Sequence, residues 1–286
     1  MGFDGFELSQ VDLGEASVRV RRGGSGPPLL LLHGWPETHM MWSRVAGELA
    51  RDFTVVAPDL RGYGDSSKPP SVDDHETYSK RAMARDAVSL MKRFGFDSFD
   101  LAGHDRGGRV GYRLALDHPG VVRRLSILDI VPTGEVWARA NRAFALGYWH
   151  WAFLAQPAPL PERAVAADVE GFLFRGGGAM FDEDAYADYL RCAADPETIR
   201  AMCEDYRAGA SYDYALDMSE RGKRRIDCPV QVLWGSKGAL AAWYDVLAVW
   251  RDWADDVTGY AIDAGHFIPE ERPAETLAAL RAFHLA

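Results

Sequence analysis

Short apolar runs alternate with helix-like segments through most of this chain, and this alternation restricts its fold more than any other feature. Five runs in the first half have strand character: Ser17–Arg21, Leu29–His33, Thr54–Asp59, Phe99–Gly103 and Leu125–Ile130. Apolar residues at helical spacing, from Met83 to Phe94, separate two of them. Because short apolar strands separated by helices require crossover connections, the sequence predicts an α/β fold with a mostly parallel sheet.

The middle of the chain has a different character. From Thr133 to about Arg221 it is rich in alanine, aromatic and acidic residues and has no β-branched run. We expect helices there at Glu135–Leu154, Asp182–Ala193 and Pro196–Ala208. Two strands, at Val230–Trp234 and Thr258–Ile262, and two helices, at Ala241–Trp253 and Pro273–Phe283, should follow. The sequence therefore predicts a core of residues 1–132 and 222–286, flanked by helices, with a helical cap (lid) of residues 133–221 inserted into it.

Charge and cysteine content limit the classes of partner. The 286 residues include 42 acidic and 32 basic side chains, for a net charge of −10. Because nucleic-acid binding needs a basic face, we expect no nucleic-acid partner, and a small anion would require a local group of cations.

The cysteines and the apolar runs bear on the location of the protein. There are three cysteines, Cys192, Cys203 and Cys228, and none are spaced as CxxC. An odd number without this spacing is typical of reduced thiols. The longest aliphatic run, Leu29–Leu32, is too short for a membrane span, and residues 1–7 lack signal-peptide character, so we expect a cytoplasmic protein without a membrane partner.

A strand-to-helix turn with two glycines carries the sharpest chemical signal. Gly103-His104-Asp105-Arg106-Gly107 follows one predicted strand and precedes a helical window. Such a turn places its central residue at a strained elbow, and its flanking glycines let two backbones approach closely. Esterases have serine at the centre, whereas a carboxylate there suits attack on a tetrahedral carbon and formation of an alkyl-enzyme ester. Asp105 is thus a candidate nucleophile, with an ordinary helix N-cap as the alternative.

A histidine after the last predicted strand is the candidate base. His266 follows Gly265, and the order of nucleophile first and histidine last is that of hydrolases with this elbow. An acid must orient it, but residues 235–244, after the preceding strand, contain no Asp or Glu. Asp129 closes an earlier strand, and Asp263 lies closer to His266 in sequence. We choose Asp129.

Two further groups suit an anionic substrate. Arg106 and Arg109 lie three residues apart on the expected helix, so both can point to one face and clamp a carboxylate, although Arg109 could instead form a helical ion pair with Asp105. His33-Gly34-Trp35-Pro36 follows a strand, and its turn can place the Trp35 amide beside the Arg106 amide as an oxyanion hole. Because His33 has no second ligand at metal-binding spacing, we expect no metal site, and nothing in the sequence calls for a cofactor.

These residues and several longer motifs resemble the haloacetate (fluoroacetate) dehalogenases of the α/β-hydrolase fold. The motifs are His33-Gly34-Trp35-Pro36-Glu37-Thr38, Gly103-His104-Asp105-Arg106-Gly107-Gly108-Arg109-Val110, Tyr112-Arg113-Leu114-Ala115-Leu116-Asp117-His118-Pro119, Leu128-Asp129-Ile130-Val131-Pro132-Thr133, His150-Trp151-Ala152-Phe153-Leu154-Ala155-Gln156-Pro157, Cys203-Glu204-Asp205-Tyr206-Arg207-Ala208-Gly209 and Gly265-His266-Phe267. The resemblance covers nearly the whole chain, the cap included.

The resemblance implies a role for each candidate. Asp105 is then the nucleophile, Asp129 and His266 complete a catalytic triad, and Arg106 with Arg109 bind the substrate carboxylate. It also implies a halide pocket, a homodimer and no cofactor. The pocket residues are His150, Trp151 and Tyr206.

Two of the implied halide ligands are adjacent in sequence. On a helix His150 and Trp151 diverge by about 100°, so both reach one ligand only at the inner edge of the cap. On the residues alone, an aromatic core cluster with Tyr148 and Trp149 explains them better. Imidazole, indole and phenol groups can nevertheless supply the donors that a departing halide needs.

One segment departs from the family pattern. Fluoride-active members of the family carry another cap tryptophan in the region that corresponds to Gly171–Arg175. This chain has Phe172, Leu173 and Phe174 there instead. A smaller side chain would enlarge the pocket, so the preference between fluoroacetate and a bulkier haloacid stays open.

The sequence therefore predicts hydrolytic dehalogenation of short 2-haloacids through an aspartyl ester. An epoxide hydrolase with the same aspartate nucleophile is the enzymatic alternative, and it would need paired cap tyrosines. A hydrolase-fold receptor that binds a small acid without turnover is the non-enzymatic alternative. A receptor would have no need of the complete set Asp105, Asp129 and His266.

Overall fold

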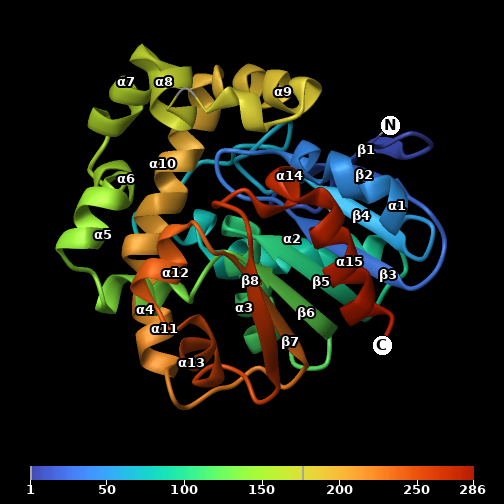
Figure 1. Cartoon of the computed structure of the whole chain (residues 1–286). Helices are drawn as coiled ribbons and strands as arrows, with labels where there is room; N and C mark the ends of the chain where they lie inside the picture. Colours follow the sequence, from blue (N-terminus) through green and yellow to red (C-terminus); the bar gives the residue numbers. More distant parts are fainter. Residues whose placement is uncertain (1, 176) are drawn as a thin grey trace.

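A single sheet forms the centre of the molecule (Figure 1). In this computed structural model, which describes residues 2–175 and 177–286, eight strands pair in the order β1-β2-β4-β3-β5-β6-β7-β8. The strands are β1 (Glu7–Asp12), β2 (Ser17–Gly23), β3 (Pro28–Leu32), β4 (Thr54–Pro58), β5 (Phe99–His104), β6 (Val122–Leu128), β7 (Val230–Gly235) and β8 (Val257–Ile262). From β4 to β8 in the sheet order every pairing is parallel, whereas β1 with β2 and β2 with β4 are antiparallel. The mostly parallel sheet predicted from the sequence is confirmed.

Seven of the eight strands coincide with predicted ones, and the reason lies in their burial. β3, β4 and β5 are buried along their whole length, so they read as continuous apolar runs. β1 was not predicted. It is an edge strand, and its residues are exposed or half-buried, so it lacks the apolar pattern of the others.

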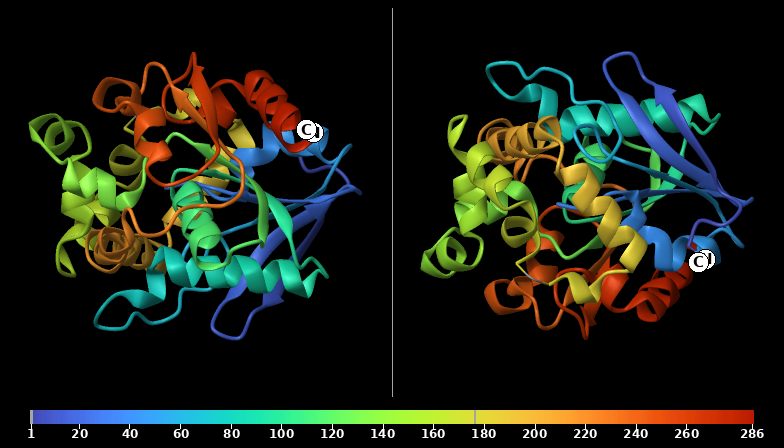
Figure 2. Two further views of the ribbon diagram at one scale, coloured as in Figure 1. Left: turned by 90° about the horizontal axis from the view of Figure 1, so that it is seen from below. Right: turned by 90° about the horizontal axis from the view of Figure 1, so that it is seen from above.

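Helices cover both faces of the sheet. α2 (Lys80–Arg93) packs against α3 (Arg106–Asp117), while α1 (Ser43–Leu49) packs against α15 (Pro273–His284) on the opposite face, as the two views of Figure 2 show. Shorter elements complete this part of the chain: η1 (His39–Trp42), η2 (Glu76–Tyr78), α12 (Ala239–Trp243), α13 (Val246–Arg251) and α14 (Ile268–Glu271). The helix expected at Ala241–Trp253 is thus two helices, because Asp245 caps α13 by accepting from the amide of Ala248.

Between β6 and β7 the described residues form helices and no strand. These helices are α4 (Thr133–Ala138), α5 (Arg142–Gly147), α6 (Trp149–Leu154), α7 (Leu160–Ala167), α8 (Val169–Phe174), η3 (Gly178–Met180), α9 (Glu183–Ala193), α10 (Pro196–Ala210) and α11 (Tyr212–Glu220). Helices α5 to α8 lie on the left of Figure 1, away from the sheet. The expected helices at Asp182–Ala193 and Pro196–Ala208 match α9 and α10. The division of the chain into core and cap stays a prediction.

The single helix expected at Glu135–Leu154 is wrong, because the chain forms three short helices there. Asn141 starts the second one, and its side chain accepts from the amides of Ala143 and Phe144. At Tyr148 the backbone leaves helical geometry before the third begins. α7, α8 and α11 were not predicted at all.

The topology determines where chemistry can be placed. Parallel strands end at the same edge of a sheet, so the segments that follow β3, β5, β6 and β8 meet there. These segments carry Trp35, Asp105, Asp129 and His266. Among the described residues no helix is both long and apolar enough to cross a membrane.

Candidate active site

The elbow at Asp105 has the strained backbone that its sequence predicts. Asp105 joins β5 to α3 with φ 41° and ψ −110°. A Cβ at Gly103 would lie 2.4 Å from the carbonyl oxygen of Gly107, and one at Gly107 would lie 2.2 Å from that of Leu32. Both positions therefore require glycine, and the tight turn holds the Asp105 carboxylate at the ends of the strands.

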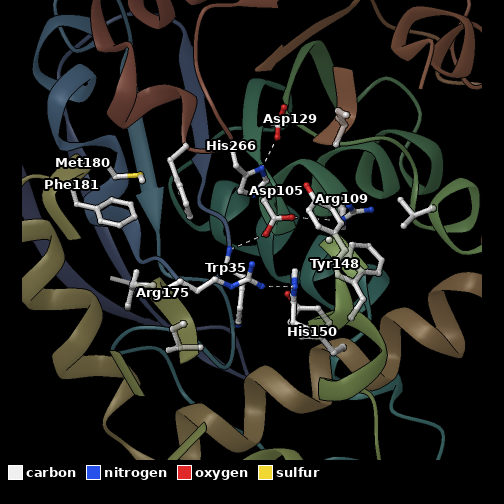
Figure 3. Close-up of a pocket in the computed structure, with 18 of the residues that line it drawn as sticks. Trp35, Asp105, Arg109, Asp129, Tyr148, His150, Arg175, Met180, Phe181 and His266 are labelled. Atoms are coloured by element: carbon white, nitrogen blue, oxygen red, sulfur yellow. Dashed lines mark hydrogen bonds and ion pairs between the residues drawn. The ribbon is translucent and has the colours of Figure 1, made fainter. Parts of the chain in front are cut away.

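Positive charge and an amide surround the Asp105 carboxylate (Figure 3). Its Oδ2 accepts from the backbone amide of Trp35 at 3.1 Å, and its Oδ1 lies 3.8 Å from Nε of Arg109. Burial alone would raise the pKa of this carboxyl, but the charges of Arg106, His266 and Arg109 outweigh burial and hold the pKa below its usual range. Asp105 is therefore ionised at neutral pH, as a nucleophile must be.

His266 and Asp129 form a close pair beside Asp105. His266 Nδ1 lies 2.6 Å from Asp129 Oδ2, and Asp129 Oδ1 accepts from the amide of Gly235 at 2.8 Å. Because a carboxylate only accepts, Nδ1 is the donor, and Nε2 is left as the basic nitrogen. The alternative acid, Asp263, instead pairs with Lys237 at 2.8 Å, and its side chain is 67% exposed.

A second histidine holds the His266 loop, and sequence reasoning missed it. His104 Nε2 lies 2.8 Å from the carbonyl oxygen of His266, and its Nδ1 lies 3.0 Å from Oε2 of Glu37. Burial raises the pKa of Glu37 to about 7, next to Glu270, whose pKa burial also raises. Both His104 and Glu37 belong to the quoted motifs, so position inside the motifs was the available signal.

The two arginines lie close together, but they differ in access to the cavity. The guanidinium carbons of Arg106 and Arg109 lie 5.1 and 4.6 Å from the ring centre of Trp151. Arg109 lines the cavity beside Asp105, whereas Arg106 lies behind the ring of Tyr206, 3.8 Å from its centre. Nε and Nη2 of Arg106 and Nε of Arg109 are buried and donate no hydrogen bond to any described residue.

The three expected halide ligands line this same cavity of about 190 Å³. His150 and Trp151 are neighbours on α6, Tyr206 is on α10, and the His150 ring stacks on Trp35 at 5.2 Å. Burial and the charge of nearby Arg175 lower the pKa of His150 to about 3. The alternative, an aromatic core cluster, holds for Trp151, which is buried against Phe144 and Tyr148, but not for Trp149, which is 38% exposed.

The segment without the additional tryptophan forms one wall of the cavity. Leu173 and Phe174 line it, followed by Arg175, Met180 and Phe181. Phe172 faces away and packs on Trp149 and Phe153. The guanidinium of Arg175, which sequence reasoning also missed, lies 3.4 Å from Nδ1 of His150. Arg109 and Arg175 thus bring two cations to the cavity of an acidic protein.

Within residues 2–175 and 177–286 no group of three or more His, Cys, Asp or Glu side chains is arranged to hold a metal ion. Cys192, Cys203 and Cys228 are buried free thiols.

Comparison with known proteins places this chain in a family. The model of the alpha/beta hydrolase fold matches residues 27–273. A fluoroacetate dehalogenase from Burkholderia sp is 45% identical over 289 aligned residues, which cover 98% of this chain and 94% of the relative. A soluble epoxide hydrolase from Corynebacterium sp. (strain C12) is 35% identical, with 87% of each chain covered.

Among solved structures, an alpha/beta hydrolase from Nostoc sp PCC 7120 superimposes with a TM-score of 0.96. It is 49% identical, and the match covers 99% of both chains. The chain therefore belongs to the α/β-hydrolase fold family and, within it, to the haloacetate dehalogenase family of hydrolases.

Proposed function

We propose that this enzyme hydrolyses short 2-haloacids, such as fluoroacetate and chloroacetate, to the 2-hydroxyacid and halide. One observation carries the proposal: three buried guanidinium nitrogens, two on Arg106 and one on Arg109, make no hydrogen bond within the described chain and lie near an ionised Asp105. Buried donors are nearly always paired, so unpaired ones indicate a ligand with acceptor oxygens. A carboxylate provides these oxygens and compensates the positive charge.

The first step is a displacement at carbon. The arginines hold the substrate carboxylate, and one oxygen of Asp105 attacks the α-carbon as the carbon–halogen bond breaks. The halide leaves with the bonding electrons, and Asp105 becomes an ester. His150, Trp151 and Tyr206 donate hydrogen bonds to the halide as its charge develops. Alignment of nucleophile, carbon and leaving group supplies much of the rate.

The second step returns the enzyme to its initial state. Nε2 of His266, oriented by Asp129, takes a proton from water, and the hydroxide attacks the carboxyl carbon of the Asp105 ester. The backbone amides of Trp35 and Arg106 hold the oxyanion. When the ester bond breaks, the alkoxide takes the proton from His266, and the Asp105 carboxyl, which carries the remaining proton of the attacking hydroxide, releases it to solvent and is a carboxylate again. A haloacetate thus yields glycolate.

The core and cap have separate tasks in this proposal. Residues 1–132 and 222–286 supply Asp105, Asp129 and His266, while the cap, residues 133–221, supplies the halide ligands. The homodimer and the cytoplasmic location expected from the sequence belong to the same proposal. Light scattering on the purified protein tests the dimer.

A His266→Asn variant tests the proposed reaction. Without the base, the ester should accumulate, and intact-mass spectra after exposure to chloroacetate should show one carboxymethyl group, located on Asp105 by peptide mapping. The matched control is the double variant H266N and D105N, which should show none. A His266→Asn protein that folds and stays unmodified would contradict the aspartyl-ester route.

An epoxide hydrolase remains the second candidate, because Tyr148 and Tyr206 both line the cavity and could protonate an epoxide oxygen. The relative from Corynebacterium favours the same alternative. Styrene oxide and chloroacetate, assayed side by side, separate the two. Diol without halide release would favour the epoxide hydrolase, and binding without turnover of any haloacid would favour a receptor.

A further inference from the structure

We propose that Asp205, on cap helix α10, is a positioning residue that holds Arg106 so that its unpaired N–H edge meets the substrate carboxylate. This inference rests on the proposed function and assigns a task to a residue next to Tyr206. Asp205 is fully buried and lies against Nη1 of Arg106, so its proposed task is to act through Arg106.

Asp205 joins three side chains of the core. Its Oδ1 pairs closely with Nζ of Lys80 and lies 3.5 Å from Nη1 of Arg106. Its Oδ2 accepts from the hydroxyl of Tyr63 at 2.5 Å. All four side chains are buried. An ionised carboxylate away from water needs such partners, and the three of them fix its position.

The contact determines which edge of Arg106 stays available. Asp205 engages Nη1, whereas Nε and Nη2 donate to no described residue. Nε and Nη2 point in the same direction and form the edge with which arginine binds both oxygens of a carboxylate. Tyr206 covers the flat face of the guanidinium at 3.8 Å. With Asp205 at Nη1 and the rings of Tyr206 and Trp151 beside the guanidinium, the edge formed by Nε and Nη2 is the one that lacks a hydrogen-bond acceptor among the described residues.

Lys80 is the second cation beside Asp205, so the negative charge of Asp205 is not directed at Arg106 alone. A lone aspartate beside Arg106 would neutralise the cation that the substrate needs. Here Asp205 shares its negative charge between Lys80 and Arg106. Burial would raise the pKa of Asp205, but the charges of Lys80 and Arg106 lower it, so the carboxyl remains ionised. Asp205 therefore faces two cations. Lys80 also lies 3.6 Å from Asp213, and Arg106 is paired with Asp205 only through Nη1.

The arrangement also connects the cap with the carboxylate clamp. Asp205 precedes Tyr206 on α10, while Arg106 begins α3 directly after Asp105. The helix that carries a proposed halide ligand thus also fixes an arginine next to the nucleophile. Asp205 should therefore matter most for anionic ligands.

The test compares Asp205→Asn with Asp213→Asn. Asp213 is an equally buried carboxylate that lies 3.6 Å from the same Lys80, and its only side-chain ion pair within the described residues is this one. The two readouts are KM and kcat for chloroacetate and the dissociation constants of acetate and of neutral acetamide, measured by calorimetry on the full-length protein. In D205N we expect KM for chloroacetate and the acetate constant to rise about tenfold or more, because a misplaced donor loses a charge-assisted hydrogen bond. Acetamide binding and the D213N variant should change less than about threefold.

A second, milder variant keeps the test decisive if D205N does not fold. Tyr63→Phe removes one hydrogen bond to Asp205 without changing any charge, and it should weaken acetate binding by several-fold while the unfolding midpoint remains close to that of the parent. The proposal is overturned if D205N and D213N weaken acetate binding to the same extent. It is also overturned if folded D205N or Y63F binds acetate with the affinity of the parent protein, or if the parent protein binds no acetate. If the parent binds acetate but releases no halide from any haloacid, the proposed function fails, while acetate binding still decides the role of Asp205.

Discussion

His266 Nδ1 lies 2.6 Å from Asp129 Oδ2, although 137 residues separate the two in sequence. The acid comes from the end of β6, and Asp129 has a left-handed backbone with φ 54°. Its other oxygen is held by the amide of Gly235, so the carboxylate cannot rotate away from the imidazole. This contact makes Nδ1 of His266 the donor and leaves Nε2 as the basic nitrogen.

Asp129→Asn should slow turnover by about 10⁴-fold, because an amide at this position can donate to Nδ1 and favour the wrong histidine tautomer. The first release of halide should remain fast, since that step does not need the base. Rapid-mixing measurements of halide release check both statements. Asp263→Asn is the matched control, because Asp263 is exposed and lies outside the pair. Equal losses in the two variants would contradict the assignment of Asp129.

Ester formation should not depend on pH between about 5 and 8. Burial would raise the pKa of Asp105, but Arg106 and the other nearby charges depress it. A carboxyl with a depressed pKa stays ionised as the pH falls and loses its charge only below that depressed value. The measurement is the halide burst in the His266→Asn variant, which lacks the catalytic base of the second step. A burst that falls steeply between pH 6 and 5 would show that Asp105 is protonated there.

Leu173→Trp should restrict the enzyme to smaller substrates, because Leu173 lines the cavity in the segment that lacks the additional tryptophan. We expect kcat/KM for 2-bromobutyrate to fall about tenfold relative to chloroacetate, which corresponds to roughly 1.4 kcal/mol of lost transition-state binding. Phe172→Trp is the control, since Phe172 packs on Trp149 outside the cavity. If both variants left the ratio unchanged, this wall would not determine specificity.

Gly103→Ala should destabilise the protein by about 2 kcal/mol or more, because the new methyl would meet the Gly107 backbone at 2.4 Å. Gly209→Ala, on helix α10, has its nearest neighbour at 3.6 Å and should change stability by less than about 1 kcal/mol. Chemical unfolding compares the two. A Gly103→Ala protein as stable as its parent would mean that the elbow tolerates a side chain.

The sequence predicted the sheet well because its physical signal is local. Strands such as β3 and β5 are buried on both faces and therefore read as apolar runs. The elbow was equally readable, since only glycine fits at Gly103 and Gly107. The sequence also indicated that the residues directly after the strands lie close together, because parallel strands end at the same edge of a sheet.

The segment between β6 and β7 was harder to predict for a physical reason. Its helix ends depend on single capping contacts, such as the Asn141 side chain on α5, and a periodic apolar pattern does not reveal them. Arg175 and Phe181 reach the cavity through the packing of these helices, and no local motif marks them. Asp205 and Glu37 are buried carboxylates whose partners come from distant segments, so no local sequence pattern reveals their contacts.

In the proposed reaction an oxygen of Asp105, and not water, attacks the substrate carbon. A single turnover in oxygen-18 water, with enzyme in excess over chloroacetate, distinguishes the two routes. We predict glycolate with an unlabelled hydroxyl oxygen, derived from Asp105, and one labelled oxygen in the Asp105 carboxylate. Glycolate that carries the label in its hydroxyl group, with Asp105 unlabelled, would contradict the account.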